Sequence, residues 1–186
     1  MTGAAHIRTA EATDAVACAA VYAPYVLEGA TSFEETAPTA QEMAARIATA
    51  HLWLVAEIGG RVVGFAYGDR FRSRSAYRWA AEVSVYIDRD HHGRGIGRAL
   101  YVELIAALDD AGFCTLCAGI TQPNPASIRL HESLGFTNVG TYTRIGFKRG
   151  SWHDVLWLKL DLVEGQGSVP GPLRKPALRG DRAAED

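Results

Sequence analysis

The feature that most constrains the fold is a glycine-rich turn, HHGRGIG at residues 91–97, which joins two stretches of different periodicity. The preceding stretch, EVSVYI, has the alternation and β-branched content of a strand. In the following stretch, apolar residues from Ile96 to Leu108 recur every fourth position, which is typical of an amphipathic helix. Unsatisfied amides and the dipole at a helix N-terminus favour an anion, and glycines let it come close. The turn therefore predicts a strand–turn–helix unit that binds a phosphate.

The spacing of the turn excludes the two commonest phosphate-binding loops. A P-loop needs a lysine and then Ser or Thr at the helix start, but Arg98 and Ala99 stand there. A dinucleotide-binding turn needs G-x-G-x-x-G, whereas the spacing here is G-x-G-x-G. The remaining interpretations are a tight turn without a ligand, or an anion held by backbone amides with arginines nearby. The residues concerned are Gly93, Arg94, Gly95, Gly97 and Arg98.

Composition limits the partners of the chain. Its 186 residues fit one domain, and a formal net charge of -2 argues against broad nucleic-acid binding, which needs a basic face. No apolar run approaches the roughly 20 residues needed to cross a bilayer. The first residues, MTGAAHIRTAEATD, lack the basic start and apolar core of a secretory signal, so we expect a cytoplasmic protein with a small-molecule partner.

Neither a disulfide framework nor a metal site is expected. The chain has three cysteines, an odd number, and no export signal. Cys114 and Cys117 lie three apart on a predicted strand, where they would point to opposite faces. His91 and His92 are adjacent in a turn, and adjacent side chains rarely converge on one ion.

The order of predicted elements indicates a mixed α/β domain over residues 1–164, followed by a polar, Gly- and Pro-rich tail over 165–186 that we expect to be disordered or loosely held. We expect Pro24 to interrupt the first helix, because proline has no amide hydrogen. The expected strands span 6–10, 52–58, 61–71, 79–87, 114–120, 136–147 and 152–160, and the expected helices span 11–26, 39–50, 96–112 and 124–135.

Two motifs resemble those of the GNAT family of N-acetyltransferases. HHGRGIG looks like the acyl-CoA loop of the family, Gln or Arg, two residues, Gly, one residue, Gly or Ala, although His92 replaces the usual Gln or Arg. NPASIRLHESLGF is similar to the second family motif, an Asn before a helix that ends in Gly-Phe. The resemblance covers residues 5 to 162.

This resemblance implies a fold and a cofactor. The implied fold is a mixed, mostly antiparallel twisted sheet of about seven strands with about four helices, whose central strands are splayed to admit acetyl-CoA. No metal is implied. The residues implied to bind the cofactor are Val85, Tyr86 and Ile87 for the pantetheine arm, Gly93, Arg94, Gly95, Ile96, Gly97 and Arg98 for the pyrophosphate, and Asn124 and Ser133 along the arm.

The catalytic candidates are Glu82 and His131. Glu82 is a carboxylate in an otherwise apolar strand, where burial would raise its pKa toward the range of a general base. A solvent-facing glutamate is the alternative from the pattern alone, but the resemblance favours the base. His131 stands where the family commonly has the tyrosine that protonates the thiolate, so His131 could act as an acid or as a base. The alternative is a polar residue on an amphipathic helix without a catalytic role.

Three stretches, FRSRSAYRWAAEVSVYI, RLHESLGF and GFKRGSWHDVLW, resemble the phosphinothricin and methionine sulfoximine N-acetyltransferases within the family. Arginine binds a carboxylate through two parallel hydrogen bonds, so the arginines before the catalytic strand suit an amino-acid acceptor. A solvated basic loop is the alternative. The implied acceptor-binding residues are Phe33, Arg72, Arg74, Tyr77, Val83 and Ser84.

The sequence therefore predicts direct acetyl transfer, within a ternary complex, from acetyl-CoA to a small amino-acid analogue. Phosphinothricin, methionine sulfoximine and methionine sulfone remain open as acceptors. The resemblance also implies a homodimer with the site near its interface and a role in detoxification. Acetylation of a peptide N-terminus or another small amine, and a CoA-binding sensor without catalysis, are the alternatives.

Overall fold

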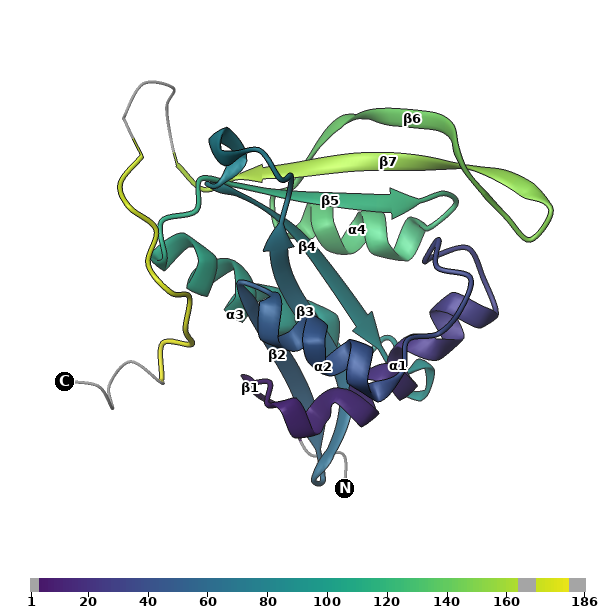
Figure 1. The fold of residues 1–186 in the computed structure, drawn as a ribbon, viewed down its shortest axis with the longest axis horizontal. Coiled ribbons are helices and arrows are strands. Elements are labelled where there is room, and N and C mark those ends of the chain that lie inside the picture. Colours follow the sequence, from purple (N-terminus) through teal and green to yellow (C-terminus); the bar gives the residue numbers. More distant parts are fainter. Residues whose placement is uncertain (1–3, 164–169, 181–186) are drawn as a thin grey trace.

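The computed structural model describes residues 4–163 and 170–180, and its strands form a seven-stranded sheet in the order β1-β2-β3-β4-β5-β7-β6 (Figure 1). Only the β4–β5 pair within this sheet is parallel, which confirms the predicted mixed, mostly antiparallel architecture. The strands are β1 (His6–Thr9), β2 (Leu52–Ile58), β3 (Arg61–Arg70), β4 (Ala80–Ile87), β5 (Thr115–Thr121), β6 (Thr137–Lys148) and β7 (Ser151–Asp161). The α-helices are α1 (Ala15–Leu27), α2 (Ala40–Thr49), α3 (Ile96–Asp110) and α4 (Pro125–Ser133).

Helices cover both faces of the sheet, because successive residues of its central strands point to opposite sides (Figure 1). On one side, Trp53 and Phe65 are buried against α1 and α2. On the other, Leu54 and Ala66 are buried against α3. None of the helices in the described ranges is long and apolar enough to cross a membrane.

The local turn signals of the sequence are confirmed. Gly59 and Gly60 join β2 to β3 with φ of 59° and 79°, the left-handed pair that a type I′ hairpin turn requires. Thr39 caps α2 by accepting from the Glu42 amide, and the Glu42 carboxylate in turn accepts from the Thr39 amide. Asn124 caps α4 in the same way, accepting from the Ser127 amide at 3.1 Å.

The prediction that Pro24 interrupts the first helix is wrong. Pro24 lies inside α1, which continues to Leu27, and the Glu28 amide donates to the Pro24 carbonyl at 3.0 Å. Pro24 belongs to the last turn of α1. Its missing amide hydrogen therefore costs one backbone hydrogen bond close to the end of the helix, where the regular hydrogen bonding stops anyway.

The β6–β7 hairpin is the most exposed part of the sheet and curves away from the body of the molecule (Figure 1). Its register shifts at Asn138/Gly140 and again at Tyr142/Gly146. β6 is an edge strand, and the hairpin exposes large apolar side chains beside polar ones such as Thr141 and Arg144. The large exposed side chains are Val139, Tyr142, Ile145, Phe147 and Trp152.

Residues 170–180, part of the predicted tail, contain no helix or strand but lie against the domain. The Trp79 indole donates to the Gly171 carbonyl at 2.9 Å, and the Arg174 amide donates to the Ala111 carbonyl at 2.8 Å. Leu178 is buried in the core beside α3. In this segment the chain packs on the domain rather than standing free, because it has apolar anchors among its polar residues; residues 165–169 and 181–186 of the predicted tail lie outside the described ranges.

Candidate active site

The central strands separate beside the glycine-rich turn. β4 pairs with β5 from Ala80 to Glu82 and no further, after which β5 continues along β7. A cavity of about 420 Å³ opens where they part, with the 83–87 segment of β4 on one side and the 118–121 segment of β5 on the other. Backbone groups of β4 that point toward β5 therefore face a cavity instead of a neighbouring strand, and such groups need hydrogen-bond partners.

Most of the predicted cofactor-binding residues line this cavity, and most of the predicted catalytic and acceptor residues do not. The lining includes Val83, Ser84, Val85, Tyr86, Ile87, Gly93, Gly95, Ile96, Gly97, Arg98, Asn124 and His131. The predicted residues outside the lining are Phe33, Arg72, Arg74, Tyr77, Glu82, Arg94 and Ser133.

The glycine-rich turn closes one end of the cavity at the start of α3. Gly93 and Gly95 have φ of 72° and 77°, and a Cβ at either position would meet nothing within 4 Å. Glycine is therefore required there for its left-handed backbone, not for space. Gly97 differs, since a Cβ there would be in ordinary van der Waals contact with the Leu130 side chain, 3.5 Å away.

His92, at the position where the family usually has Gln or Arg, holds the end of β4. Its Nε2 lies 2.9 Å from the Tyr25 hydroxyl and 3.0 Å from the Ile87 carbonyl oxygen. Tyr25 itself donates to the Ile87 carbonyl at 2.5 Å and lines the cavity. Sequence analysis missed Tyr25, because it lies on α1, 62 residues before Ile87.

His131 is 3% exposed and forms a pair with Tyr101 on the cavity wall. Its Nδ1 lies 2.8 Å from the Ser127 carbonyl, an acceptor, so Nδ1 carries the proton. Nε2, 3.0 Å from the Tyr101 hydroxyl, is then the acceptor of that hydroxyl's hydrogen bond. Burial lowers the pKa of His131 and raises that of Tyr101, which keeps both groups neutral.

Sequence analysis also missed Tyr101. It stands next to Leu100 in the apolar stripe of α3 and is fully buried, so its pattern is that of a core residue. Only its contact with the histidine of α4, 30 residues later, gives the hydroxyl a place in the site.

Glu82 lies where β4 and β5 separate. Its carboxylate is 38% exposed and stands 3.7 Å from the Arg72 guanidinium. Burial raises the pKa of Glu82. The positive charge of Arg72 opposes this rise, and the negative charge of Asp69, the residue opposite Glu82 on β3, adds to the rise. Cys117 is its partner on β5. A carboxylate whose pKa is raised at the edge of a cleft is suited to accept a proton near neutral pH.

The predicted acceptor-binding residues of the 71–79 connection are placed unequally. The Arg72 guanidinium lies 4.1 Å from the Phe71 ring and 5.4 Å from the Trp157 ring, beside Glu82. Arg74 is exposed at the start of a short 3-10 helix, and Tyr77 is 42% exposed, with its ring 5.8 Å from that of Phe71. The structure therefore brings Arg72, and not the other two, to the candidate base.

Phe33 and Ser133 lie away from the cavity for different reasons. Phe33 is 39% exposed and rests on the β6–β7 hairpin, with its ring 6.2 Å from that of His153. Ser133 is exposed at the last residue of α4 and donates to the Leu130 carbonyl at 2.7 Å. Since Asn124 meets the cavity at the other end of α4, Ser133 does not reach the lining.

The cysteines Cys18, Cys114 and Cys117 are free thiols. Over residues 4–163 and 170–180, no group of three or more His, Cys, Asp or Glu side chains could hold a metal ion.

Known proteins share both the sequence pattern and this architecture. The family model of the acetyltransferase (GNAT) domain matches residues 7–157. The chain is 36% identical over 171 residues to phosphinothricin N-acetyltransferase of Streptomyces viridochromogenes, with 90% of this chain and 91% of the relative covered. It is 37% identical over 162 residues to L-methionine sulfoximine/L-methionine sulfone acetyltransferase of Salmonella typhimurium, covering 85% of this chain and 95% of the relative.

A solved structure agrees with these relatives. The GNAT superfamily phosphinothricin acetyltransferase from Sinorhizobium meliloti, in complex with AcCoA, superposes with a TM-score of 0.86 at 37% identity. The match covers 91% of this chain and 94% of that protein.

Proposed function

Since the chain belongs to the GNAT family of acetyltransferases, we propose that it moves the acetyl group of acetyl-CoA to the amino group of a small amino-acid analogue of the phosphinothricin or methionine sulfoximine type. The observation that carries the proposal is the separation of β4 from β5 beside the glycine-rich turn, with Glu82 at the point of separation. Detoxification of such analogues in the cytoplasm is the corresponding biological role.

The donor is bound mainly by backbone. Amides of the glycine-rich turn, the N-terminus of α3 and the Arg98 guanidinium provide a site for a pyrophosphate. The unpaired edge of β4 accepts the pantetheine arm as a neighbouring strand would. Asn124 lies on the opposite wall, at the start of α4.

Transfer is direct, within a ternary complex. Glu82 removes a proton from the acceptor ammonium, directly or through a water, and the free amine attacks the thioester carbonyl carbon. A β4 amide facing the cavity stabilises the negative charge that develops on the carbonyl oxygen. The C–S bond then breaks, the nitrogen of the new amide loses its second proton to solvent, and the leaving thiolate takes up a proton.

The Tyr101 hydroxyl is the source of that proton, and His131 positions it. Because the Nδ1 proton of His131 is bound to the Ser127 carbonyl and its Nε2 is an acceptor, neutral His131 has no proton to offer toward the cavity. Tyr101 presents a hydroxyl on the same wall. In this step the hydroxyl turns from the Nε2 atom of His131 toward the sulfur, gives its proton to the thiolate, and regains one from solvent after the products leave.

Arg72 binds the carboxylate of the acceptor, because its guanidinium stands beside Glu82 with its face against Phe71 and Trp157. Phe33 forms a wall of the acceptor side-chain pocket. Arg74 and Tyr77, which are exposed, complete the binding loop when the acceptor is present, together with the Val83 and Ser84 segment of β4.

The protein acts as a homodimer joined through the β6–β7 hairpin. An edge strand with a row of large apolar side chains is a surface that soluble proteins rarely leave bare. Light scattering after size exclusion should give twice the chain mass of 20.1 kDa. Replacing Phe147 and Trp152 together with serine should give the monomer mass.

A thiol-release assay with acetyl-CoA tests the reaction. The acceptors are phosphinothricin, methionine sulfoximine, methionine sulfone, the common amino acids and several short peptides. We expect turnover with members of the first group. Turnover with peptides alone would show an N-terminal acetyltransferase, and acetyl-CoA binding without any turnover would show a sensor.

A further inference from the structure

The loop between α1 and α2, residues 28–38, is held from two sides although it contains no helix or strand. Figure 1 shows it reaching the end of β5, near the β6–β7 hairpin. The Thr121 hydroxyl donates to the Thr31 carbonyl at 3.5 Å, and Thr31 lines the cavity. An exposed connection of this length is usually among the more mobile parts of a fold, so its anchors need a reason.

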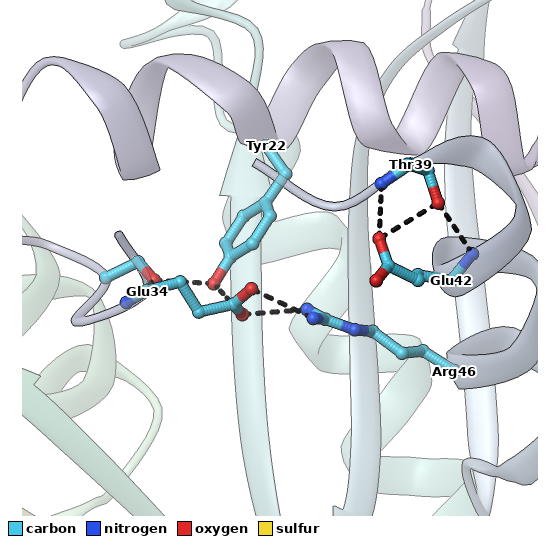
Figure 2. Close-up of polar contacts among 6 residues, drawn as sticks. Tyr22, Glu34, Thr39, Glu42 and Arg46 are labelled. Carbon is cyan, nitrogen blue, oxygen red and sulfur yellow. Dashed lines mark hydrogen bonds and ion pairs between the residues drawn. The ribbon is translucent and has the colours of Figure 1, made fainter. Parts of the chain in front are cut away.

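The first anchor comes from the helices. Arg46 of α2 donates two hydrogen bonds, at 2.8 and 2.9 Å, to the two carboxylate oxygens of Glu34 (Figure 2). The Tyr22 hydroxyl of α1 donates to the same carboxylate at 2.9 Å and lies 2.7 Å from the Ser32 hydroxyl. The ion pair lowers the pKa of Glu34, so the carboxylate stays charged.

The second anchor comes from the β6–β7 hairpin. Lys148, at the end of β6, is 7% exposed, and its ammonium donates to the carbonyls of Val26 and Ser32 at 2.6 Å each. The lysine thus ties the end of α1 and the middle of the loop to a strand more than a hundred residues later. A charge buried this deeply is costly unless hydrogen bonds satisfy it, which these two carbonyls do.

Phe33 lies between the two anchored residues, Ser32 and Glu34. Its ring rests on Gly146 of β6, where a Cβ would lie 2.3 Å from the Phe33 Cε2 atom. The ring therefore fills the space that the missing glycine side chain leaves. Both its backbone and the surface beneath it are fixed.

We propose that Lys148 and the Glu34–Arg46 pair are positioning residues that, through Phe33, set which acceptor side chains the enzyme takes. The proposal rests on the proposed function, in which Phe33 walls the acceptor pocket. A wall ordered in advance spares the acceptor the entropy cost of ordering it, so the anchors act on acceptor affinity rather than on the donor.

The test uses two anchor variants with matched controls. Lys148→Met and Arg46→Met remove one anchor each. Lys175→Met removes an exposed lysine far from the loop, and Glu42→Gln weakens the Thr39 cap of α2 without touching Glu34 (Figure 2). KM for the best acceptor, KM for acetyl-CoA, the unfolding midpoint, and hydrogen exchange of peptides within residues 28–38 are measured for each.

Each anchor variant should raise the acceptor KM by about 10-fold or more, as expected for losing charged hydrogen bonds. KM for acetyl-CoA should change by less than about two-fold, since that site is held by backbone. Exchange within residues 28–38 should become faster. Both controls should match the wild type in the acceptor KM and in the exchange of this loop.

A further variant, Gly146→Ala, displaces the Phe33 ring without touching either anchor. It should change the ranking of acceptors by side-chain size while exchange of the loop stays at the wild-type rate. An unchanged ranking would show that Phe33 does not select acceptors and would overturn that part of the proposal.

Three results count against the anchors. If loop exchange in Lys148→Met equals that in Lys175→Met, the lysine is not an anchor. If the loop loosens and the acceptor KM does not move, loop order does not control the acceptor. If both KM values rise together with a lower unfolding midpoint, the role is general stability. Should the wild type acetylate no amino acid, the proposed function fails, and the exchange measurements alone decide whether the anchors exist.

Discussion

The donor side and the acceptor side of this site are built in different ways. In our proposal the donor side is centred on one short stretch, β4 through the start of α3, with β5 and α4 as the opposite walls, and it offers mostly backbone groups. The acceptor side, as we propose it, gathers side chains from two distant segments, residues 28–38 and 71–79, and the β6–β7 hairpin supports Phe33 from below. Backbone groups are the same in every sequence, so we expect the donor side to tolerate a replacement such as His92 and the acceptor side to change with each side chain.

This contrast predicts that substitutions on one side should leave the other side's binding intact. The sharpest case is Glu82→Gln, which should lower kcat by about 10²- to 10⁴-fold, because the base is lost. KM for acetyl-CoA should stay near the wild-type value. The comparison is Asp69→Asn, which removes a carboxylate of β3 that helps to raise the pKa of Glu82; it should move the rising limb of the pH–rate profile to lower pH and leave the plateau of kcat near the wild-type value. Full turnover by Glu82→Gln would remove Glu82 from the mechanism.

Arg72→Ala should have the next largest effect, on the acceptor. Losing a charged, two-pronged contact predicts a rise of about 10- to 100-fold in the acceptor KM. Since Arg72 also opposes the burial that raises the pKa of Glu82, its loss should move the rising limb of the pH–rate profile to higher pH. Arg72→Lys should restore the wild-type pH–rate profile more fully than the acceptor KM, because lysine supplies the positive charge but not the two parallel hydrogen bonds of a guanidinium. A change in the KM for acetyl-CoA instead of the acceptor KM would contradict the separation of a donor side from an acceptor side.

Gly95→Ala tests the donor side. A Cβ has space there, but φ of 77° costs a non-glycine residue roughly 1–2 kcal/mol. The empty loop can relax and must return to this conformation on binding, so acetyl-CoA should bind about 10-fold more weakly in calorimetry. Gly180→Ala, at a position with open space and an ordinary φ, is the control. An equal rise in the acceptor KM would argue against separate sides.

The smallest effect concerns stability. The pKa of His131 is lowered in the folded state, so the unfolded chain binds its proton more readily. The stabilising contribution is complete above the unfolded pKa of about 6.5 and is lost as the pH falls toward the lowered folded value. The free energy of unfolding measured with urea should therefore fall from pH 7 to pH 5, and His131→Gln should make it less dependent on pH. A slope unchanged in the variant would place the pH dependence elsewhere.

The same division explains what the sequence could predict. The strands and helices, the caps of α2 and α4 and the strand–turn–helix unit around the glycines depend on signals within a few residues, and the structure agrees with them. The prediction for Pro24 was wrong because the rule that proline breaks a helix takes no account of how near the end of the helix the proline lies. The partners Tyr101 and Lys148 depend on contacts 30 or more residues apart, for which no local pattern exists.

The segment 170–180 gives α3 a second role. At its N-terminus this helix faces the cavity, and at its C-terminus the Arg174 amide donates to the Ala111 carbonyl and the Arg174 guanidinium to the Asp110 carbonyl. Arg179 adds a second positive charge at the same end by pairing with the Asp110 side chain. Negative charge at one end and positive charge at the other is the arrangement that a helix macrodipole favours. Segment 170–180 thus brings positive charge to the end of α3 that lies opposite the proposed anion site.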